Sequence, residues 1–160
     1  MTTLQPGDIA PDFTLPVHDG SSFHLAAQRG HPVVLYFYPQ DDTAGCTDEN
    51  REFSELADQF AALGARLIGI SPDSIADHQK FAGKYNLQVS LASDPDHLAI
   101  AAYGLWQLKK LYGREFMGLI RTSFLIAADG TIAAAIRATR IRGHAQKMLQ
   151  TLQAHRAKHG

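Results

Sequence analysis

The chain contains a single cysteine, Cys46, within the stretch YPQDDTAGCTDEN. Thr43 is a favourable helix N-cap, so Ala44, Gly45 and Cys46 would form the first turn of a following helix. Free backbone N–H groups and the positive end of the helix dipole would then lie beside the sulfur and favour the thiolate over the thiol. Gly45 leaves room for a small substrate, and Pro39, which has no N–H, would form a stiff wall. This spacing predicts a nucleophilic thiolate.

A plainer interpretation of Cys46 also exists, because a lone cysteine is often only a small buried side chain. Its neighbours Asp41, Asp42, Asp48 and Glu49 are polar, which favours a helix start near solvent over a core position. The same acidic groups oppose a negative charge on the sulfur. A reactive Cys46 therefore requires a cation from elsewhere in the chain.

The composition bounds the class of protein. A length of 160 residues with 45% hydrophobic residues predicts one domain over residues 1–160. The net charge of -1 gives no overall attraction to nucleic acid or an anionic membrane. The first residues lack a signal-peptide pattern, and the longest apolar stretch, Val33 to Tyr38, is too short to cross a bilayer. We expect a cytoplasmic protein without an internal disulfide, a metal or another cofactor.

The hydrophobic periodicity predicts an α/β protein with a central mixed β-sheet flanked by helices and an N-terminal β-hairpin. Expected strands are Val33 to Tyr38, Ala65 to Ile70, Val89 to Ala92, Leu119 to Ile126 and Thr131 to Ile136. Expected helices run from Thr43 to Leu63, from Ser74 through Tyr85, from Ser93 to Ala102, and from Ala145 onward, after Gly143 and His144. Leu105 to Gly118 is expected to be a loop with Trp106 as an ordered anchor. Simple packing is expected of Trp106, Phe116 and Met117, and the alternatives are that they line the substrate pocket or a dimer surface.

Several segments together resemble one family. The stretch PQDDTAGC matches the P-x-x-x-T-x-x-C signature of the peroxiredoxins, and YFYPQDDTAGCTDE resembles their bacterioferritin comigratory protein, or peroxiredoxin Q, branch. GDIAPDFTLPVHDG, LIGISPDS, LASDPDHLAIAAYGLW and YGREFMGLIRTSFLIAADG are similar to segments of the same branch in the same order. The resemblance covers most of the chain.

The resemblance implies a thioredoxin-like fold and the thiol-dependent reduction of hydrogen peroxide and organic hydroperoxides. Cys46 then corresponds to the peroxidatic cysteine, Thr43 to the hydroxyl that binds the peroxide, and Pro39 to the residue that shields the pocket. Arg121 in GLIRTSF corresponds to the arginine of the family site and would supply the missing cation. With the N–H groups of Gly45 and Cys46, it would stabilise the charge that grows as the O–O bond breaks.

Glu49 falls where the family often has a polar residue that orients the arginine. A resolving cysteine that many members of the branch carry is absent, and its position is occupied by Arg51. The sulfenic acid on Cys46 would therefore be reduced by an external thiol, either thioredoxin or glutathione with glutaredoxin. Arg51 either steers an acidic group of that donor or is a solvated helix residue near Glu55. Ala44 stands where the family often has proline, and the chain is expected to be a monomer or a weak homodimer.

Two other classes of function remain open from the sequence. A non-enzymatic peroxide sensor would form a mixed disulfide with a partner through oxidised Cys46. A cysteine hydrolase would need a histidine base, and no motif ties any of the available histidines to Cys46; these are His24, His31, His78 and His97. His155 and His159 have the spacing of metal ligands but lack a third ligand.

Overall fold

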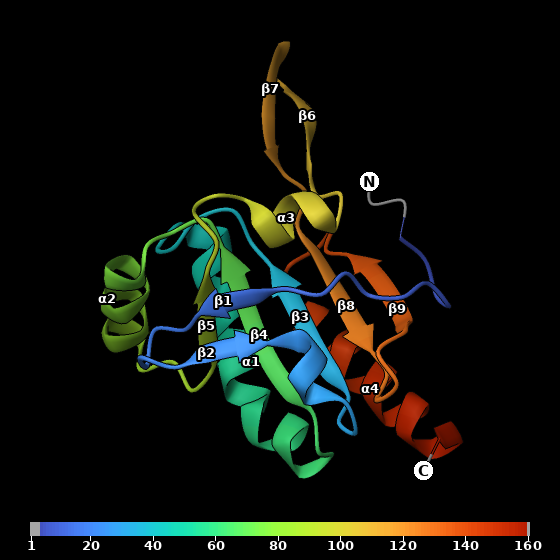
Figure 1. The fold of residues 1–160 in the computed structure, drawn as a ribbon. Helices are drawn as coiled ribbons and strands as arrows, with labels where there is room; N and C mark the ends of the chain where they lie inside the picture. The colour runs from blue at the N-terminus through green and yellow to red at the C-terminus, as the bar shows by residue number, and fades with distance from the viewer. Residues whose placement is uncertain (1–3, 160) are drawn as a thin grey trace.

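The computed structural model describes residues 4–159, and a five-stranded sheet with the order β5-β4-β3-β8-β9 forms its centre (Figure 1). β3 (Val33–Phe37) pairs in parallel with β4 (Arg66–Ser71), which pairs in parallel with β5 (Ser90–Ser93). On the other side of β3, β8 (Thr122–Ile126) and β9 (Ile132–Arg137) run antiparallel. Every side chain of β3 is buried, as the continuous apolar run predicts for a strand covered on both faces. The mixed sheet is confirmed.

Three helices cover one face of this sheet. They are α1 (Ala44–Ala62), α2 (Ile75–Tyr85) and α4 (His144–His159). Figure 1 shows α1 and α4 behind the sheet and α2 beside its β5 edge. Val34 and Tyr36 of β3 point into the apolar cluster on this face, and Cys46 belongs to the same cluster. The cysteine therefore lies on the three-helix side of the central strand.

The opposite face is covered by shorter elements. The N-terminal hairpin consists of β1 (Thr14–Pro16) and β2 (Ser22–His24), and it is followed by a 3₁₀ turn over Leu25–Gln28. α3 (Leu98–Ala102) covers the same face, where Leu35 of β3 joins the second apolar cluster. The N-terminal β-hairpin is confirmed. No helix within residues 4–159 combines the length and apolarity needed to cross a membrane.

The ends of the helix that carries Cys46 follow the sequence closely. Thr43 is the N-cap of α1, with φ -85° and ψ 157°, and Leu63 is the C-cap. Gly64 then adopts a φ of +77°, a left-handed conformation in which glycine has no steric penalty. The predicted helix from Thr43 to Leu63 is confirmed.

The segment expected to be a loop is instead a second hairpin. β6 (Trp106–Leu111) and β7 (Arg114–Leu119) pair antiparallel, and Figure 1 shows them projecting from the body of the molecule above α3. Tyr112 and Gly113 join the strands with φ angles of 51° and 75°, as a two-residue hairpin turn requires. The predicted loop is wrong because both faces of most of this hairpin meet solvent, so no alternating apolar pattern marks its strands.

The hairpin also changes the expected places of its aromatic and adjacent residues. Trp106 is 37% exposed and lies against the ring of His97, with centroids 4.4 Å apart. Phe116 and Met117 are 43% and 49% exposed, so the expectation of simple packing is wrong, and the alternative of a dimer surface stays a prediction. Leu119 ends β7 rather than beginning the next strand, which starts at Thr122. The two residues between them form the connection that carries Arg121.

Candidate active site

Cys46 occupies the first turn of α1, as its spacing from Thr43 predicts. The N–H of Thr47 donates to the carbonyl oxygen of Thr43 at 2.8 Å, which closes the first helical hydrogen bond. Helix geometry therefore leaves the N–H groups of residues 44–46 without intrahelical acceptors. These donors and the helix dipole favour a negative charge at this end of α1.

The cysteine side chain is buried, with 0% exposure, so the expected position near solvent is wrong. Residues distant in the sequence pack against the helical turn that carries it. A Cβ atom on Gly45 would lie 2.8 Å from Cδ1 of Ile141 and 3.6 Å from Nη2 of Arg121. Gly45 therefore allows the side chains of Ile141 and Arg121 to pack closely against the first helical turn. The acidic residues that flank Cys46 in the sequence do not indicate this packing.

Arg121 provides the cation that the acidic sequence context of Cys46 requires. Its Nη2 donates to the Sγ of Cys46 at 3.3 Å, and its Nη1 donates to Oε1 of Glu49 at 2.6 Å. Burial opposes charge on the guanidinium, but the opposing charges of Glu49 and Cys46 outweigh it and hold the pKa of Arg121 above its ordinary value. The structure thus brings together three of the residues chosen from the sequence.

Glu49 is a buried carboxyl group, and only one of its two oxygen atoms accepts a hydrogen bond within residues 4–159. Its side chain is 1% exposed, and within residues 4–159 its Oε2 has no hydrogen-bond partner. Burial raises the pKa of Glu49 to about 7, although the charge of Arg121 and the hydrogen bond from it act in the opposite direction. The carboxyl therefore titrates near neutral pH.

Replacing Glu49 with glutamine should remove part of the pH dependence of stability. A carboxyl pKa that folding raises means that the folded protein binds the proton more tightly, so this contribution to stability is lost as the pH rises from 4.5 to about 7. Above about pH 7, the wild-type protein has lost about 3 kcal/mol of its free energy of unfolding through Glu49. Glu49→Gln should not show this loss. Urea unfolding at about pH 5 and about pH 8 measures the difference. The exposed Glu55→Gln on the same helix is the control, and equal pH dependence in wild type and Glu49→Gln would refute the assignment.

A chain of hydrogen bonds ties the Cys46 turn to the central strand. Tyr36 donates to Oδ1 of Asn50 at 2.8 Å, and Nδ2 of Asn50 donates to the carbonyl oxygen of Cys46 at 2.9 Å. The Tyr36 ring stacks on Phe53 with centroids 4.1 Å apart. A Cβ on Gly69, which pairs with Tyr36 across β3 and β4, would lie 2.6 Å from the ring, so a larger residue there would force the ring to shift. The position of the cysteine backbone thus depends on a tightly packed aromatic ring.

The remaining residues chosen from the sequence lie nearby on the chain but have other contacts. Thr43 is exposed, and its Oγ1 donates to the carbonyl oxygen of Gln40 at 3.1 Å. Pro39 is half-buried immediately after β3, and Arg51 is exposed on α1. Their roles depend on substrate or donor and stay predictions.

Lys109 is a residue near the site that the sequence did not reveal. Its Nζ donates to the carbonyl oxygen of Leu119 at 3.1 Å. Burial lowers the pKa of Lys109, and the charges of Arg121 and Arg137 lower it further. The side chain reaches this place because it folds back along the β6–β7 hairpin over Gly118. No pattern in the sequence indicates it, because the hairpin itself was not predicted.

Comparisons with known proteins identify the family of this chain. The model of the AhpC/TSA family matches residues 6–135, and the chain therefore belongs to that family of peroxiredoxins. Peroxiredoxin Bcp of Bacillus subtilis is 40% identical over 151 residues, which cover 94% of this chain and 96% of the relative. A structure of Xanthomonas campestris peroxiredoxin Q has a TM-score of 0.87 at 34% identity and covers 97% of this chain and 98% of its own.

Those relatives place the chain in the bacterioferritin comigratory protein, or peroxiredoxin Q, branch, and Cys46 is its single cysteine. The thioredoxin-like fold implied by the resemblance is confirmed by the same structural likeness. A second Xanthomonas campestris structure, with a TM-score of 0.86 at 33% identity, concerns the alkyl peroxide reduction activity of that bacterioferritin comigratory protein. It covers 98% of this chain and 99% of its own.

Proposed function

We propose that this peroxiredoxin is a thiol-dependent peroxidase that reduces hydrogen peroxide and organic hydroperoxides through Cys46. The observation that carries the proposal is the 3.3 Å contact between Nη2 of Arg121 and the Sγ of Cys46 at the start of a helix. A guanidinium and free N–H groups beside one sulfur favour the thiolate, which is the reactive form of cysteine. The alkyl peroxide activity of the Xanthomonas campestris relative supports the choice of substrate class.

In the first step, the Cys46 thiolate attacks the outer oxygen of the peroxide. An S–O bond forms, the O–O bond breaks, and the sulfur is oxidised to sulfenic acid while the peroxide is reduced to water or an alcohol. Arg121 and the N–H groups of Gly45 and Cys46 stabilise the negative charge on the leaving oxygen, which takes up a proton. Thr43 holds the peroxide through its hydroxyl, Pro39 shields the pocket, and Glu49 orients Arg121 through the 2.6 Å ion pair.

In the second step, external thiols restore the enzyme. The chain has no second cysteine, so a donor thiolate attacks the sulfenic sulfur. An S–S bond forms, the S–O bond breaks, and the departing hydroxide takes up a proton from solvent to leave as water. A second donor thiol then attacks this disulfide, releases the Cys46 thiolate and leaves with the oxidised donor. Thioredoxin and glutathione with glutaredoxin are the two donor systems that we propose.

The donor step requires the first turn of α1 to open. The side chain of Cys46 is 0% exposed, and a pocket that admits a small peroxide does not admit a donor protein. Local unfolding of the first turn exposes the sulfur without unfolding the sheet.

A comparison of donors in a peroxide consumption assay tests the proposal. With thioredoxin and its reductase, or with glutathione and glutaredoxin, the enzyme should consume many equivalents of peroxide, and without a donor it should stop after about one. A peroxide sensor would stop after one equivalent in every donor mixture. Mass spectrometry should show one added oxygen on Cys46 at the end of the donor-free reaction. Absence of both turnover and sulfenic acid would overturn the proposal.

A cysteine hydrolase has less support from the structure. The hydrogen-bond partner of the Cys46 Sγ within residues 4–159 is Arg121 rather than a histidine. His78 is engaged by Asp41, and His144 is engaged by Ser123 at 2.7 Å. Burial lowers the pKa of His144 to about 4, and the nearby charges of Lys147 and Arg121 add to that effect.

Three broader expectations belong to the same proposal. We place the enzyme in the cytoplasm, where thiol donors are kept reduced. Residues 1–160 are proposed to act as a single domain and as a monomer or weak homodimer. The start of the chain, on which the absence of a signal peptide was judged, includes residues 1–3, which lie outside the described residues.

A further inference from the structure

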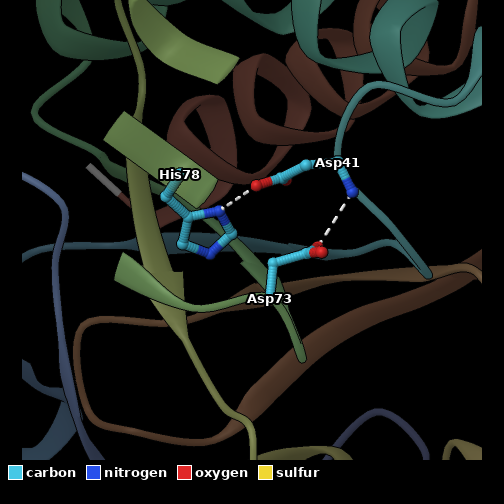
Figure 2. Close-up of side chains that lie close together, drawn as sticks. All are labelled: Asp41, Asp73 and His78. Atoms are coloured by element: carbon cyan, nitrogen blue, oxygen red, sulfur yellow. Dashed lines mark hydrogen bonds and ion pairs between the residues drawn. The ribbon is translucent and has the colours of Figure 1, made fainter. Parts of the chain in front are cut away.

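A buried acid–histidine cluster ties the loop before α1 to α2. Asp41 lies five residues before Cys46, in the loop between β3 and α1. Its Oδ2 is 2.6 Å from Nδ1 of His78 on α2, and its N–H donates to Oδ2 of Asp73 at 2.8 Å (Figure 2). The side chains of His78 and Asp41 are 0% and 5% exposed. The cluster therefore joins three separate segments in the interior beside the cysteine loop.

The polar atoms of the Asp41–His78 pair all have partners. Nε2 of His78 lies 2.9 Å from the carbonyl oxygen of Ala92, and because a carbonyl only accepts, Nε2 carries a proton. Oδ1 of Asp41 accepts from the hydroxyl of Tyr38 at 2.7 Å. A second proton lies in the hydrogen bond between Nδ1 of His78 and Oδ2 of Asp41, and the bond exists whether the histidine or the carboxyl group is the donor. Removal of either side chain would leave buried polar atoms unpaired, which is costly.

The same three residues have the residue types of a metal site, but their bonding favours another role. The ligand-type atoms of Asp41, Asp73 and His78 lie within 4.8 Å of one another. Nδ1 of His78 and Oδ2 of Asp41 already bond to each other, and Oδ2 of Asp73 already accepts from Ser71 and from the Asp41 N–H. The cluster is a closed hydrogen-bond network between loop and helix.

The next residue of the loop is attached to α2 as well. Asp42 adopts a φ of 59° and accepts hydrogen bonds from Nζ of Lys84 at 2.8 Å and from the hydroxyl of Tyr85 at 2.6 Å. Thr43, which follows, makes a local bond within the loop and begins α1. The attachment to α2 therefore ends immediately before the turn that contains Cys46.

We infer that the Asp41–His78 pair is a positioning anchor that fixes the upstream end of the Cys46 turn and limits how often that turn opens. The inference rests on the proposed function only in that opening serves the donor step. Neither residue touches the sulfur, so both act through the loop. With the anchor in place, the first turn of α1 closes against Arg121. Without it, the loop is held to α2 by the exposed contacts of Asp42 with Lys84 and Tyr85, and the turn opens more often.

The expected signature is a separation of two rates. Bulky thiol reagents react only with the open form, whereas peroxide reacts with the closed form. A charge-assisted hydrogen bond accounts for a factor of about 10 to 100 in such an equilibrium. If the open form is rare, weakening the anchor raises its population by that factor while the closed form still predominates. Reaction with the bulky reagent should therefore accelerate far more than reaction with peroxide slows.

The test measures alkylation of reduced Cys46 by a bulky maleimide and single-turnover reaction with hydrogen peroxide. Asp41→Asn, which keeps the shape of the side chain, should be alkylated about tenfold faster than wild type, and His78→Phe up to about 100-fold faster. Peroxide reaction should slow by less than about twofold in Asp41→Asn. If His78→Phe does not fold, Asp41→Asn carries the test. Hydrogen exchange should rise over residues 41–50 while β3 stays protected.

The exposed Asp12–His24 pair provides a matched control. Its Nε2 and Oδ2 atoms lie 3.0 Å apart, and its side chains are 49% and 51% exposed on the N-terminal hairpin, so His24→Phe should leave both rates unchanged. Alkylation of Asp41→Asn at the wild-type rate would overturn the anchor. A parallel loss of protection in β3 would also overturn it, because global unfolding would then explain the labelling. Because alkylation needs no peroxide turnover, a failure of the proposed peroxidase activity is seen separately.

Discussion

Replacement of Cys46 by serine should reduce peroxide turnover to the rate of the buffer alone. The substitution removes the single sulfur of the proposed reaction and replaces it with a hydroxyl that the same surroundings do not ionise at neutral pH. Loss of a nucleophile typically costs a factor of about 10⁴ or more. The measurement is peroxide consumption with each thiol donor in excess.

Two observations separate this result from a folding defect. Serine fits the volume of cysteine, so Cys46→Ser should melt cooperatively and retain the far-ultraviolet circular dichroism of the wild type. Cys46→Ala should be equally inactive, because neither variant has a cysteine thiol to oxidise. Substantial turnover by either folded variant would show that another group carries the reaction.

Replacement of Arg121 by alanine should slow the reaction of Cys46 with peroxide by about 10²- to 10³-fold, the usual effect of removing one charge-stabilising donor. The change removes the cation 3.3 Å from the sulfur and leaves the buried carboxyl of Glu49 without its partner. The thiolate fraction at neutral pH, measured by ultraviolet absorbance, should fall as well. Stopped-flow measurement of the peroxide reaction gives the rate.

Lysine and a distant arginine are the matched controls for Arg121. Arg121→Lys keeps the charge but cannot bridge Glu49 and Cys46 with two nitrogens, so it should recover only part of the rate. Arg66→Ala removes an exposed arginine at the start of β4 and should leave the rate unchanged. An unaltered thiolate fraction in Arg121→Ala would remove Arg121 from the proposed role.

The main elements could be predicted from local patterns. The apolar run that became β3 and the helix that begins after Thr43 have strong signals in neighbouring residues. The β6–β7 hairpin could not be predicted in the same way, because its apolar residues face solvent and follow no alternating pattern. Its turn at Tyr112 and Gly113 was the one available signal.

The site residues that belong to a family motif could be predicted from the sequence. The features of the site that depend on contacts between distant segments could not. The resemblance selected Arg121 and Glu49, which the structure brings to Cys46. Ile141, far along the chain, packs against Gly45 of the same helical turn, and the polar neighbours of Cys46 in the sequence do not indicate that its side chain is buried. The bond between Asp41 and His78 likewise joins residues 37 positions apart.

The close packing of Gly69 against Tyr36 limits which residues this protein can tolerate at position 69. Tyr36 is paired with Gly69 on β4 and its ring stacks on Phe53, so a methyl group added at position 69 would force that ring to shift. A displaced Tyr36 hydroxyl would disturb Asn50 and, through it, the carbonyl of Cys46. Substitution of Gly69 on β4 is thus constrained by the need to hold the backbone of Cys46 in place, although Gly69 itself has no part in the proposed reaction.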